Sequence, residues 1–241
     1  MMVTLQVLGA AVTVPADLHR RLSRLPTTDR PADAEVRADN PAHALAELTR
    51  LAVAHSPLLC VHAGVVSGPD GLIAIPGESG LGKTTLVAAL LRAGFGYVSD
   101  EALALDRDSG AVTPFPRPLS LRGDVWPLLG IAPAPPPDEE RLVPPAALER
   151  AAATDGRVRH VVLARRVPGP PRLAPAARGE AVQALLRRAF NHYRAPEASF
   201  RAVVAVVREA DVWTATYADA PELAELLGQR LRHSAAATAA R

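Results

Sequence analysis

The chain has 241 residues, of which 49% are hydrophobic and 22% charged, and its formal net charge is +2 at pH 7. This composition can form one sizeable hydrophobic core and predicts a globular domain. The arginines are dispersed and aromatic residues make up only 4%, so neither charge nor base stacking points to nucleic acid as a partner.

The sequence gives no sign of export or of a membrane anchor. No apolar run approaches the ~20 residues needed to span a bilayer. The N-terminus "MMVTLQVLGAAVTVPADLHRR" has no basic region ahead of an apolar stretch. The single cysteine, Cys60, lies in the apolar "PLLCVHAGVV" and is expected to be buried packing, which fits a reducing cytoplasm.

Three regions follow one another along the chain. Residues 1–55 alternate strand-like pieces ("VTLQVLG") with helical ones ("AHALAELTRLAVA"), and we interpret them as an N-terminal cap of the same domain. Residues 56–232 are expected to form the core. Residues 233–241, "HSAAATAAR", have few large apolar side chains to bury, and we expect them to be a disordered tail.

The core begins with a predicted hairpin followed by a helix. The apolar runs "LLCVHAGVV" and "GLIAIPG" flank "SGPDG", whose Pro, Asp and Gly are typical of a turn. Next, "KTTLVAALLRAG" has apolar residues at helical spacing, ends at Gly94 and precedes the strand-like "FGYVS". Strand, helix and strand predict a right-handed βαβ unit and an α/β fold.

Residues 131–145, "IAPAPPPDEERLVPP", are too rich in proline for a helix or a central strand. We expect an exposed, semi-stiff loop that is either a connector or a lid facing a substrate. The last third predicts strands in "RHVVLARR" and "VWTATYA", and helices in "GEAVQALLRRAF", "PEASFRAVVAVVREA" and "PELAELLGQRLR".

A phosphate-binding loop is the strongest signal in the sequence. Gly77, Gly82, Lys83 and Thr84 satisfy G-x-x-x-x-G-K-[ST] between a predicted strand and a predicted helix. Such a loop turns backbone N–H groups and a helix N-terminus toward one anion. The residues expected to bind the nucleotide are Gly77, Glu78, Ser79, Gly80, Leu81, Gly82, Lys83, Thr84 and Thr85.

Lys83 is the only lysine among the 27 basic Lys and Arg residues. It occupies the motif position where a compact ammonium must reach β- and γ-phosphate oxygens, which a planar guanidinium fits badly. Thr84 supplies a hydroxyl suited to Mg²⁺, a cation that prefers oxygen ligands. The sequence therefore predicts ATP and Mg²⁺ as cofactors.

The predicted hairpin places His62 beside the phosphate-binding loop. If "SGPDG" is the turn, residues whose numbers add to about 138 face each other, so His62 lies across from Pro76. A slip of one residue in the register would turn the imidazole to the other face of the sheet. His62 is therefore either catalytic or a structural residue of an apolar strand.

Two carboxylates, Asp100 and Glu101, follow the strand after the helix, where ligands of α/β sheets gather. One can hold Mg²⁺ while another accepts the proton of an attacking hydroxyl. The alternative is that Asp100 binds only metal or water and that Glu101 begins the next loop.

The segments "VHAGVV", "GESGLGKTT" and "YVSDE", in this order, resemble the catalytic core of the HPr kinase/phosphorylase family, mainly over residues 58–106. The resemblance implies a mixed-sheet P-loop fold of the phosphoenolpyruvate carboxykinase type with flanking helices. It also implies that His62 and Asp100 form the proton-accepting pair, that Glu101 replaces a second Asp, and that Lys83 and Thr84 bind phosphate and Mg²⁺. Thr84, Asp100 and Glu101 would be the metal ligands.

The segment "PRPLSLRGDVWPLLG" partly matches the Arg-containing signature of that family, which would make Arg122 a phosphate or transition-state contact. The family has an acid where this chain has Thr85, so the resemblance does not extend to reverse phosphorolysis. The compact length is instead similar to the stand-alone serine kinases of lasso-peptide maturation.

The leading hypothesis is an ATP- and Mg²⁺-dependent kinase that phosphorylates a Ser or Thr of a protein or peptide, with Asp100 and His62 taking the hydroxyl proton. The alternatives are a nucleotide-binding regulatory module without transfer and a small-molecule kinase. In "FNHYRAPEASF", residues 192–194 either shape the acceptor site or, with Asn191, organise a helix start. The oligomeric state stays open.

Overall fold

The computed structural model describes residues 1–38, 40–77, 82–151, 153 and 156–239, with side chains up to Arg232. Residues 78–81, which are Glu78, Ser79, Gly80 and Leu81 of the predicted phosphate loop, therefore lie outside the described residues. Every other residue to which we assigned a role is described.

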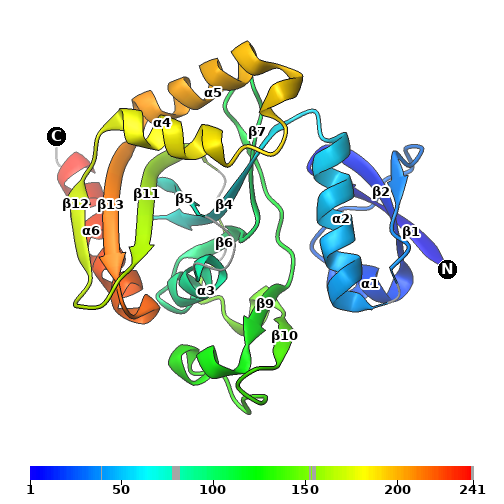
Figure 1. Cartoon of the computed structure of the whole chain (residues 1–241), viewed down its shortest axis with the longest axis horizontal. Coiled ribbons are helices and arrows are strands. Elements are labelled where there is room, and N and C mark those ends of the chain that lie inside the picture. The colour runs from blue at the N-terminus through cyan, green and yellow to red at the C-terminus, as the bar shows by residue number, and fades with distance from the viewer. Residues whose placement is uncertain (39, 78–81, 152, 154–155, 240–241) are drawn as a thin grey trace.

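A mixed β-sheet of eight strands forms the centre of the fold (Figure 1). Its strands are β4 (Leu59–Gly68), β5 (Gly71–Pro76), β6 (Gly96–Ser99), β7 (Ala102–Leu105), β8 (Val112–Thr113), β11 (Val158–Arg166), β12 (Arg172–Pro175) and β13 (Asp211–Tyr217). The order is β12-β13-β11-β5-β4-β7-β8, and β6 also pairs with β4. Strands β5, β11 and β13 are parallel, whereas β4 runs antiparallel to β5, β6 and β7. The predicted α/β class is confirmed.

Helices cover both faces of this sheet. The four helices are α3 (Lys83–Arg92), α4 (Arg178–Arg187), α5 (Pro196–Glu209) and α6 (Ala220–Ala239). Alternate residues of β5 enter different cores: Ile73 and Ile75 pack with α3 and α6, while Leu72 and Ala74 pack with α4 and α5. This alternation follows from the two-residue period of a strand and explains why β5 is apolar throughout.

The predicted hairpin is present, but its register differs by one residue from our expectation. The structure pairs Ala63 with Pro76 and Gly68 with Gly71, so Pro69 and Asp70 alone form the turn. His62 is therefore not opposite Pro76; it lies one residue beyond the paired part of β4 and β5. It pairs with Ala102 of β7 on the other side of β4. The turn is tighter than the "SGPDG" pattern suggested, because Gly68 and Gly71 still belong to the ladder.

In the predicted unit of strand, helix and strand, the two strands that α3 connects are not neighbours in the sheet. Strands β5 and β6 both run antiparallel to β4 and pair with opposite edges of it, so β4 lies between the two strands that α3 connects. The helix ends as predicted: Ala93 follows it, and Gly94 has a φ of +96°, the left-handed region that favours glycine after a helix.

Residues 1–55 form a separate small sheet with two helices (Figure 1). The strands are β1 (Met2–Val7), β2 (Ala10–Pro15) and β3 (Ala34–Glu35), and the helices are α1 (Ala16–Arg21) and α2 (Pro41–His55). Their buried residues share one cluster with Cys60, Ala102, Ala104 and Phe115 of the central part. Cys60 is fully buried, as expected from its apolar neighbours. We call residues 1–55 the N-terminal unit.

The proline-rich segment 131–145 is not a free loop. It contains strand β10 (Glu140–Val143), which pairs antiparallel with β9 (Leu119–Arg122). Its prolines also pack closely on Gly123, where an added Cβ would lie 2.1 Å from the carbonyl oxygen of Pro136. The segment is mostly exposed, as expected, but residues 140–143 are paired in a hairpin and are not a loop. The prolines before β10 lie against Gly123, and only a residue without a Cβ allows that close approach.

Helix α6 continues to Ala239 and includes most of the segment for which we expected disorder. Alanine has the highest intrinsic helix propensity, which outweighs the lack of apolar residues to bury in "AAATAA". Among the described residues, no helix combines the length and the hydropathy needed to cross a membrane.

Candidate functional site

The phosphate-loop motif ends at the first turn of α3. Gly82 has a φ of +78° and its carbonyl oxygen accepts the first helical hydrogen bond from Leu86 N–H. An L-residue other than glycine is strained at this φ, which explains the second glycine of the motif. Lys83, Thr84 and Thr85 then occupy the first turn, where backbone N–H groups have no partner within the helix.

Lys83 contacts His62 directly. Its Nζ atom lies 2.9 Å from His62 Nε2, and Glu101 Oε1 lies 3.7 Å from the same nitrogen. An ammonium group only donates, so Nε2 of the imidazole must accept. The residue that the hairpin was expected to bring beside the phosphate loop is therefore there, despite the shift in register.

A glycine in β4 makes this contact possible. A Cβ added to Gly64 would lie 2.5 Å from Val87 Cγ2 and 3.5 Å from Lys83 Cγ. Real Cβ atoms do not approach other carbons to 2.5 Å, so any larger residue would push α3 away from the strand. Gly64 thus sets the distance at which Lys83 of α3 meets His62 of β4.

The surroundings of the cluster lower the pKa of both His62 and Lys83. Burial, and then the charge of Lys83, lower the pKa of His62 below its usual value. Burial also lowers the pKa of Lys83, against the opposing effect of the Glu101 and Asp100 carboxylates. His62 is consequently a neutral imidazole at pH 7, consistent with its acceptance of the lysine hydrogen bond.

Asp100 and Glu101 lie at a break in the sheet. Strand β6 ends at Ser99 opposite Val65, and β7 begins at Ala102 opposite His62, so the two acids form the connection between these strands. The Ser99 hydroxyl accepts hydrogen bonds from the backbone N–H groups of Glu101 and Ala102 at 3.1 and 3.0 Å. Both carboxylates reach Arg117, whereas neighbouring side chains of a regular strand would point to opposite faces of the sheet.

Arg117 joins the two carboxylates. Its Nε donates to Asp100 Oδ1 at 3.1 Å and its Nη2 donates to Glu101 Oε2 at 2.7 Å. The Tyr97 hydroxyl lies 2.9 Å from both Asp100 Oδ1 and the carbonyl oxygen of Arg117, and its single proton can serve one of them at a time. Burial, and then the Asp100 charge, raise the pKa of Tyr97 well above its usual value, so the phenol remains a donor.

Asp100 and Glu101 differ in access to solvent. The Asp100 side chain is fully buried, and its Oδ2 atom has no hydrogen-bond partner among the described residues. The Glu101 side chain is 24% exposed. A buried oxygen without a partner is costly unless a ligand or an ion meets it. The two acids are therefore suited to different tasks.

These residues fit the predicted Mg²⁺ in the chemistry of their donors. Asp100 Oδ2 is an unused carboxylate oxygen, and Thr84 provides a hydroxyl at the start of α3. Mg²⁺ is usually held by one or two protein oxygens, with water and phosphate completing its shell. The part of the chain that the structure describes contains no group of three or more His, Cys, Asp or Glu residues that could hold a metal alone.

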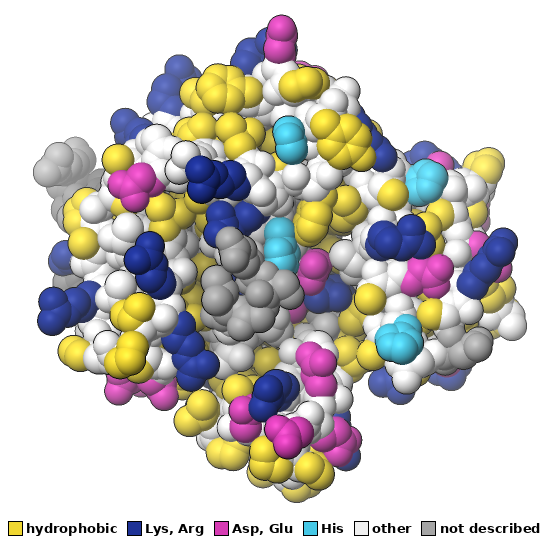
Figure 2. All heavy atoms as spheres, in the orientation of Figure 1, with side chains coloured by type: hydrophobic (Ala, Val, Ile, Leu, Met, Phe, Trp, Pro, Cys, Tyr) yellow, Lys and Arg dark blue, Asp and Glu magenta, His cyan; other side chains and the backbone are white. Residues whose placement is uncertain are grey.

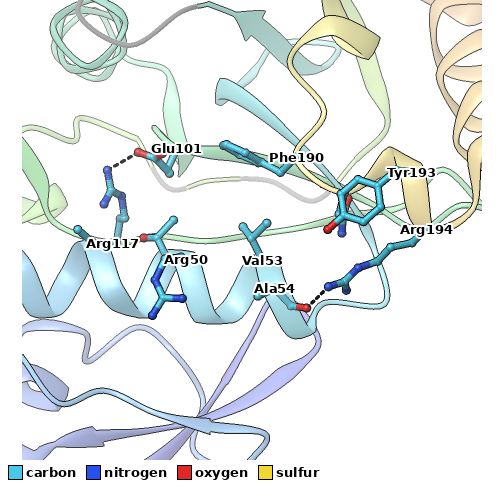
Figure 3. Close-up of a pocket in the computed structure, with 11 residues that line it drawn as sticks. Arg50, Val53, Ala54, Glu101, Arg117, Phe190, Tyr193 and Arg194 are labelled. Atoms are coloured by element: carbon cyan, nitrogen blue, oxygen red, sulfur yellow. Dashed lines mark hydrogen bonds and ion pairs between the residues drawn. The ribbon is translucent and has the colours of Figure 1, made fainter.

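A cavity of about 550 Å³ opens beside Glu101 and Arg117, between α2 and the segment after α4 (Figure 3). Its lining comprises Ala46, Thr49, Arg50, Val53, Ala54, Glu101, Arg117, Phe190, Asn191, Tyr193 and Arg194. The volume is within the range of small-ligand and substrate sites. The cavity therefore adjoins the candidate catalytic carboxylate.

The segment after α4 is fixed to β4 by Asn191. This side chain is buried, its Oδ1 accepts from Cys60 N–H at 3.0 Å, and its Nδ2 donates to Leu58 O at 2.9 Å. The Asn191 side chain thus fastens the segment to the sheet. It precedes the short 3-10 helix His192–Arg194 but makes no capping hydrogen bond there, which corrects that part of the interpretation. The adjacent Phe190 ring stacks against His62 with 5.5 Å between ring centroids.

The structure brings together His62, Lys83, Asp100 and Glu101 but gives Arg122 other partners. Arg122 Nη2 lies 3.3 Å from Asp124 Oδ2 and 3.4 Å from Asp138 Oδ1, and its side chain is 57% exposed. Arg117, five residues earlier in the same proline-containing segment, is the arginine that contacts the acids. Sequence reasoning missed Arg117 because its partners are 16 and 17 residues away and no local pattern marks the contact.

Comparisons with known proteins find similarity of structure but none of sequence. No family model matches the chain, and no curated protein sequence matches it. Among solved structures, the chain is similar to the HPr(Ser) kinase/phosphatase from Coxiella burnetii, with 14% sequence identity and a TM-score of 0.39. The alignment covers 75% of this chain and 94% of that chain.

Proposed function

We propose that this protein is a kinase that transfers the γ-phosphoryl group of ATP to the hydroxyl of a serine or threonine in a protein or peptide. The observation that carries the proposal is the cluster of Lys83, His62 and Glu101 at the end of a phosphate-loop motif, beside a cavity that can hold an acceptor. A phosphate loop alone would serve a nucleotide-binding module equally well. A carboxylate that lines a cavity beside this motif favours a transfer reaction, because the acceptor hydroxyl must lose a proton.

In the proposed reaction, the acceptor oxygen forms a bond to the γ-phosphorus while the bond between that phosphorus and the β–γ bridging oxygen breaks. The hydroxyl proton passes to Glu101, and ADP leaves. Glu101 suits this task because it lines the cavity and its Oε1 remains available while Oε2 accepts from Arg117. We assign this step to Glu101 in place of Asp100, because the Asp100 side chain is fully buried.

The other residues have supporting roles. Lys83 stabilises the negative charge that develops on the transferred group. His62, as a neutral acceptor, orients the Lys83 ammonium. Arg117 holds both carboxylates in place. Mg²⁺, held by Thr84 and Asp100, would supply further charge neutralisation of the phosphates.

The resemblance of "VHAGVV", "GESGLGKTT" and "YVSDE" to HPr kinase supports the same reaction class. A peptide-maturation kinase is the narrower form of this proposal. A cytoplasmic location, ATP as the nucleotide, and an acceptor that is neither nucleic acid nor membrane belong to this proposal. A homo-oligomer is compatible with it.

The test is transfer of label from γ-labelled ATP with Mg²⁺ into peptides and proteins of the source cells. We expect Glu101→Gln to lower transfer by about 10²- to 10⁴-fold, the usual contribution of a general base. Glu149→Gln is the matched control, because Glu149 pairs with Arg24 through both carboxylate oxygens and is absent from the cavity lining. Equal transfer by wild type and Glu101→Gln would remove Glu101 from the mechanism.

The same experiment separates the alternatives. Label that enters only dialysable products would indicate a small-molecule acceptor. Bound nucleotide without any label transfer, in wild type as in Lys83→Met, would indicate a nucleotide-binding module.

A further inference from the structure

Both walls of the cavity beside Glu101 combine apolar side chains with an arginine. The segment after α4 contributes Phe190 and Tyr193, whose exposed fractions are 40% and 66% in a chain with only 4% aromatic residues. Val53 and Ala54 of α2 face these rings across the cavity (Figure 3). In the space-filling view, hydrophobic side chains gather over α5 and between the N-terminal unit and the central part (Figure 2). Exposed aromatic side chains that line a cavity are typical of a binding surface.

The charges in the cavity are unbalanced. Three arginines line it, Arg50, Arg117 and Arg194, whereas Glu101 is the single acidic residue in the lining. Arg117 is neutralised by Asp100 and Glu101. The positive charge that remains belongs to the two arginines at the cavity walls.

These two arginines differ in their availability to a ligand. Arg194 Nη2 donates to the carbonyl oxygen of Ala54, which fastens its segment to the end of α2 (Figure 3). Arg50 has a side chain that is 69% exposed and a single long ion pair, 3.9 Å to Glu47 Oε1. Glu47 also accepts two backbone hydrogen bonds, from Arg37 and Ala38, through its other oxygen. Arg50 is therefore the cation that can turn toward a bound anion.

The helical spacing of the lining residues limits the shape of the ligand. Ala46, Arg50 and Ala54 are four residues apart and lie on one face of α2, with Val53 next to them. One helical turn is about 5.4 Å. An extended peptide advances about 3.3 Å per residue. A peptide along this face would thus present a carboxylate to Arg50 and an apolar side chain to Val53 within one or two residues of each other.

We propose that the acceptor is a peptide segment in which the serine or threonine is accompanied by an apolar residue and a carboxylate, the apolar residue packing between Val53, Phe190 and Tyr193 and the carboxylate pairing with Arg50. This inference rests on the proposed kinase function, because it uses Glu101 as the position of the acceptor hydroxyl. The carboxylate has two sources, an Asp or Glu side chain or the C-terminus of the peptide. Both place the same planar anion before a guanidinium.

The test uses short serine peptides that carry a leucine next to the serine. One set has aspartate, asparagine or lysine near the leucine and an amidated C-terminus. A second set has asparagine there and either a free or an amidated C-terminus. Phosphate transfer is measured for every peptide, and binding of the same peptides, labelled with a fluorophore, is measured by anisotropy with a non-hydrolysable ATP analogue. Binding does not depend on transfer.

We expect wild type to favour a carboxylate peptide over its neutral counterpart by about fivefold to tenfold, since the pair is partly exposed. The first set reports a side-chain carboxylate and the second a C-terminal one. In Arg50→Glu the preference should move to the lysine peptide, with ATP affinity unchanged. A general loss of structure would not reverse a charge preference.

Arg201→Glu is the matched control. Arg201 lies on α5 with a side chain 71% exposed, pairs with a glutamate of its own helix, Glu197, and is absent from the lining of this cavity. Its charge reversal should leave the peptide preference unchanged. A second variant, Val53→Asp, should weaken binding of all leucine peptides, since it places a charge on the apolar wall.

The outcomes separate this inference from the proposed function. Transfer to peptides with no charge preference, or with the same preference in wild type and Arg50→Glu, overturns the carboxylate site while the kinase stands. Charge-selective peptide binding that depends on Arg50, without transfer to any peptide, supports the site while the kinase proposal fails. Absence of both binding and transfer overturns both.

Discussion

Replacing Arg117 by methionine should destabilise the protein because it removes the counter-charge of a fully buried carboxylate. The guanidinium is itself 11% exposed and pairs with Asp100 at 3.1 Å and with Glu101 at 2.7 Å. Removing one member of a buried ion pair typically costs about 3–5 kcal/mol, because the other charge stays buried. The partly exposed pair with Glu101 adds less than about 1 kcal/mol. We therefore expect the free energy of unfolding to fall by about 4 kcal/mol.

Urea unfolding followed by tryptophan fluorescence measures this change, with Trp126 and Trp213 as the two indoles in the chain. Arg141→Met is the control: its ion pair with Glu139 is shorter, 2.6 Å, but its side chain is 54% exposed, so no shift of the midpoint is expected. Asp100→Asn should restore part of the stability in the Arg117→Met background, about 2 kcal/mol by coupling of a buried pair. An Arg117→Met midpoint equal to that of Arg141→Met would refute the buried-charge reasoning.

Three further predictions concern the surroundings of the site. The pKa of His62 lies below its usual value, so below about pH 6.5 the unfolded chain binds more protons than the folded one, and the free energy of unfolding should decrease as the pH is lowered. Unfolding scans from about pH 8 to about pH 5 should show a smaller decrease in His62→Asn. Gly64→Ala should move α3 away from β4 and weaken ATP binding measured by calorimetry, and Val87→Ala should restore part of it, because the clash is with Val87 Cγ2. Asn191→Leu should lower the unfolding free energy by about 1–3 kcal/mol for each backbone group left buried without a partner, whereas an unchanged urea midpoint would show that water replaces the amide.

The sequence by itself determined the elements around the site. Alternation and turn residues in "LLCVHAGVVSGPDGLIAIPG" predicted the hairpin of β4 and β5, and helical spacing after Lys83 predicted α3 with its end at Gly94. The phosphate-loop motif predicted a site at this end of the sheet, and His62, Lys83, Asp100 and Glu101 do meet there. These features were predictable because each depends on residues that are close in the sequence.

Only the tertiary structure decided the features that depend on distant residues. The hairpin register, the division of Asp100 and Glu101 into a buried and an accessible acid, and the choice of Arg117 over Arg122 all follow from how separate segments pack. The cavity beside Glu101 has the same origin, because α2 and the segment at Phe190 are more than a hundred residues apart in the chain. Local patterns specify which residues form a strand or a helix, but burial and ion pairing depend on which surfaces meet, and that is a property of the folded chain.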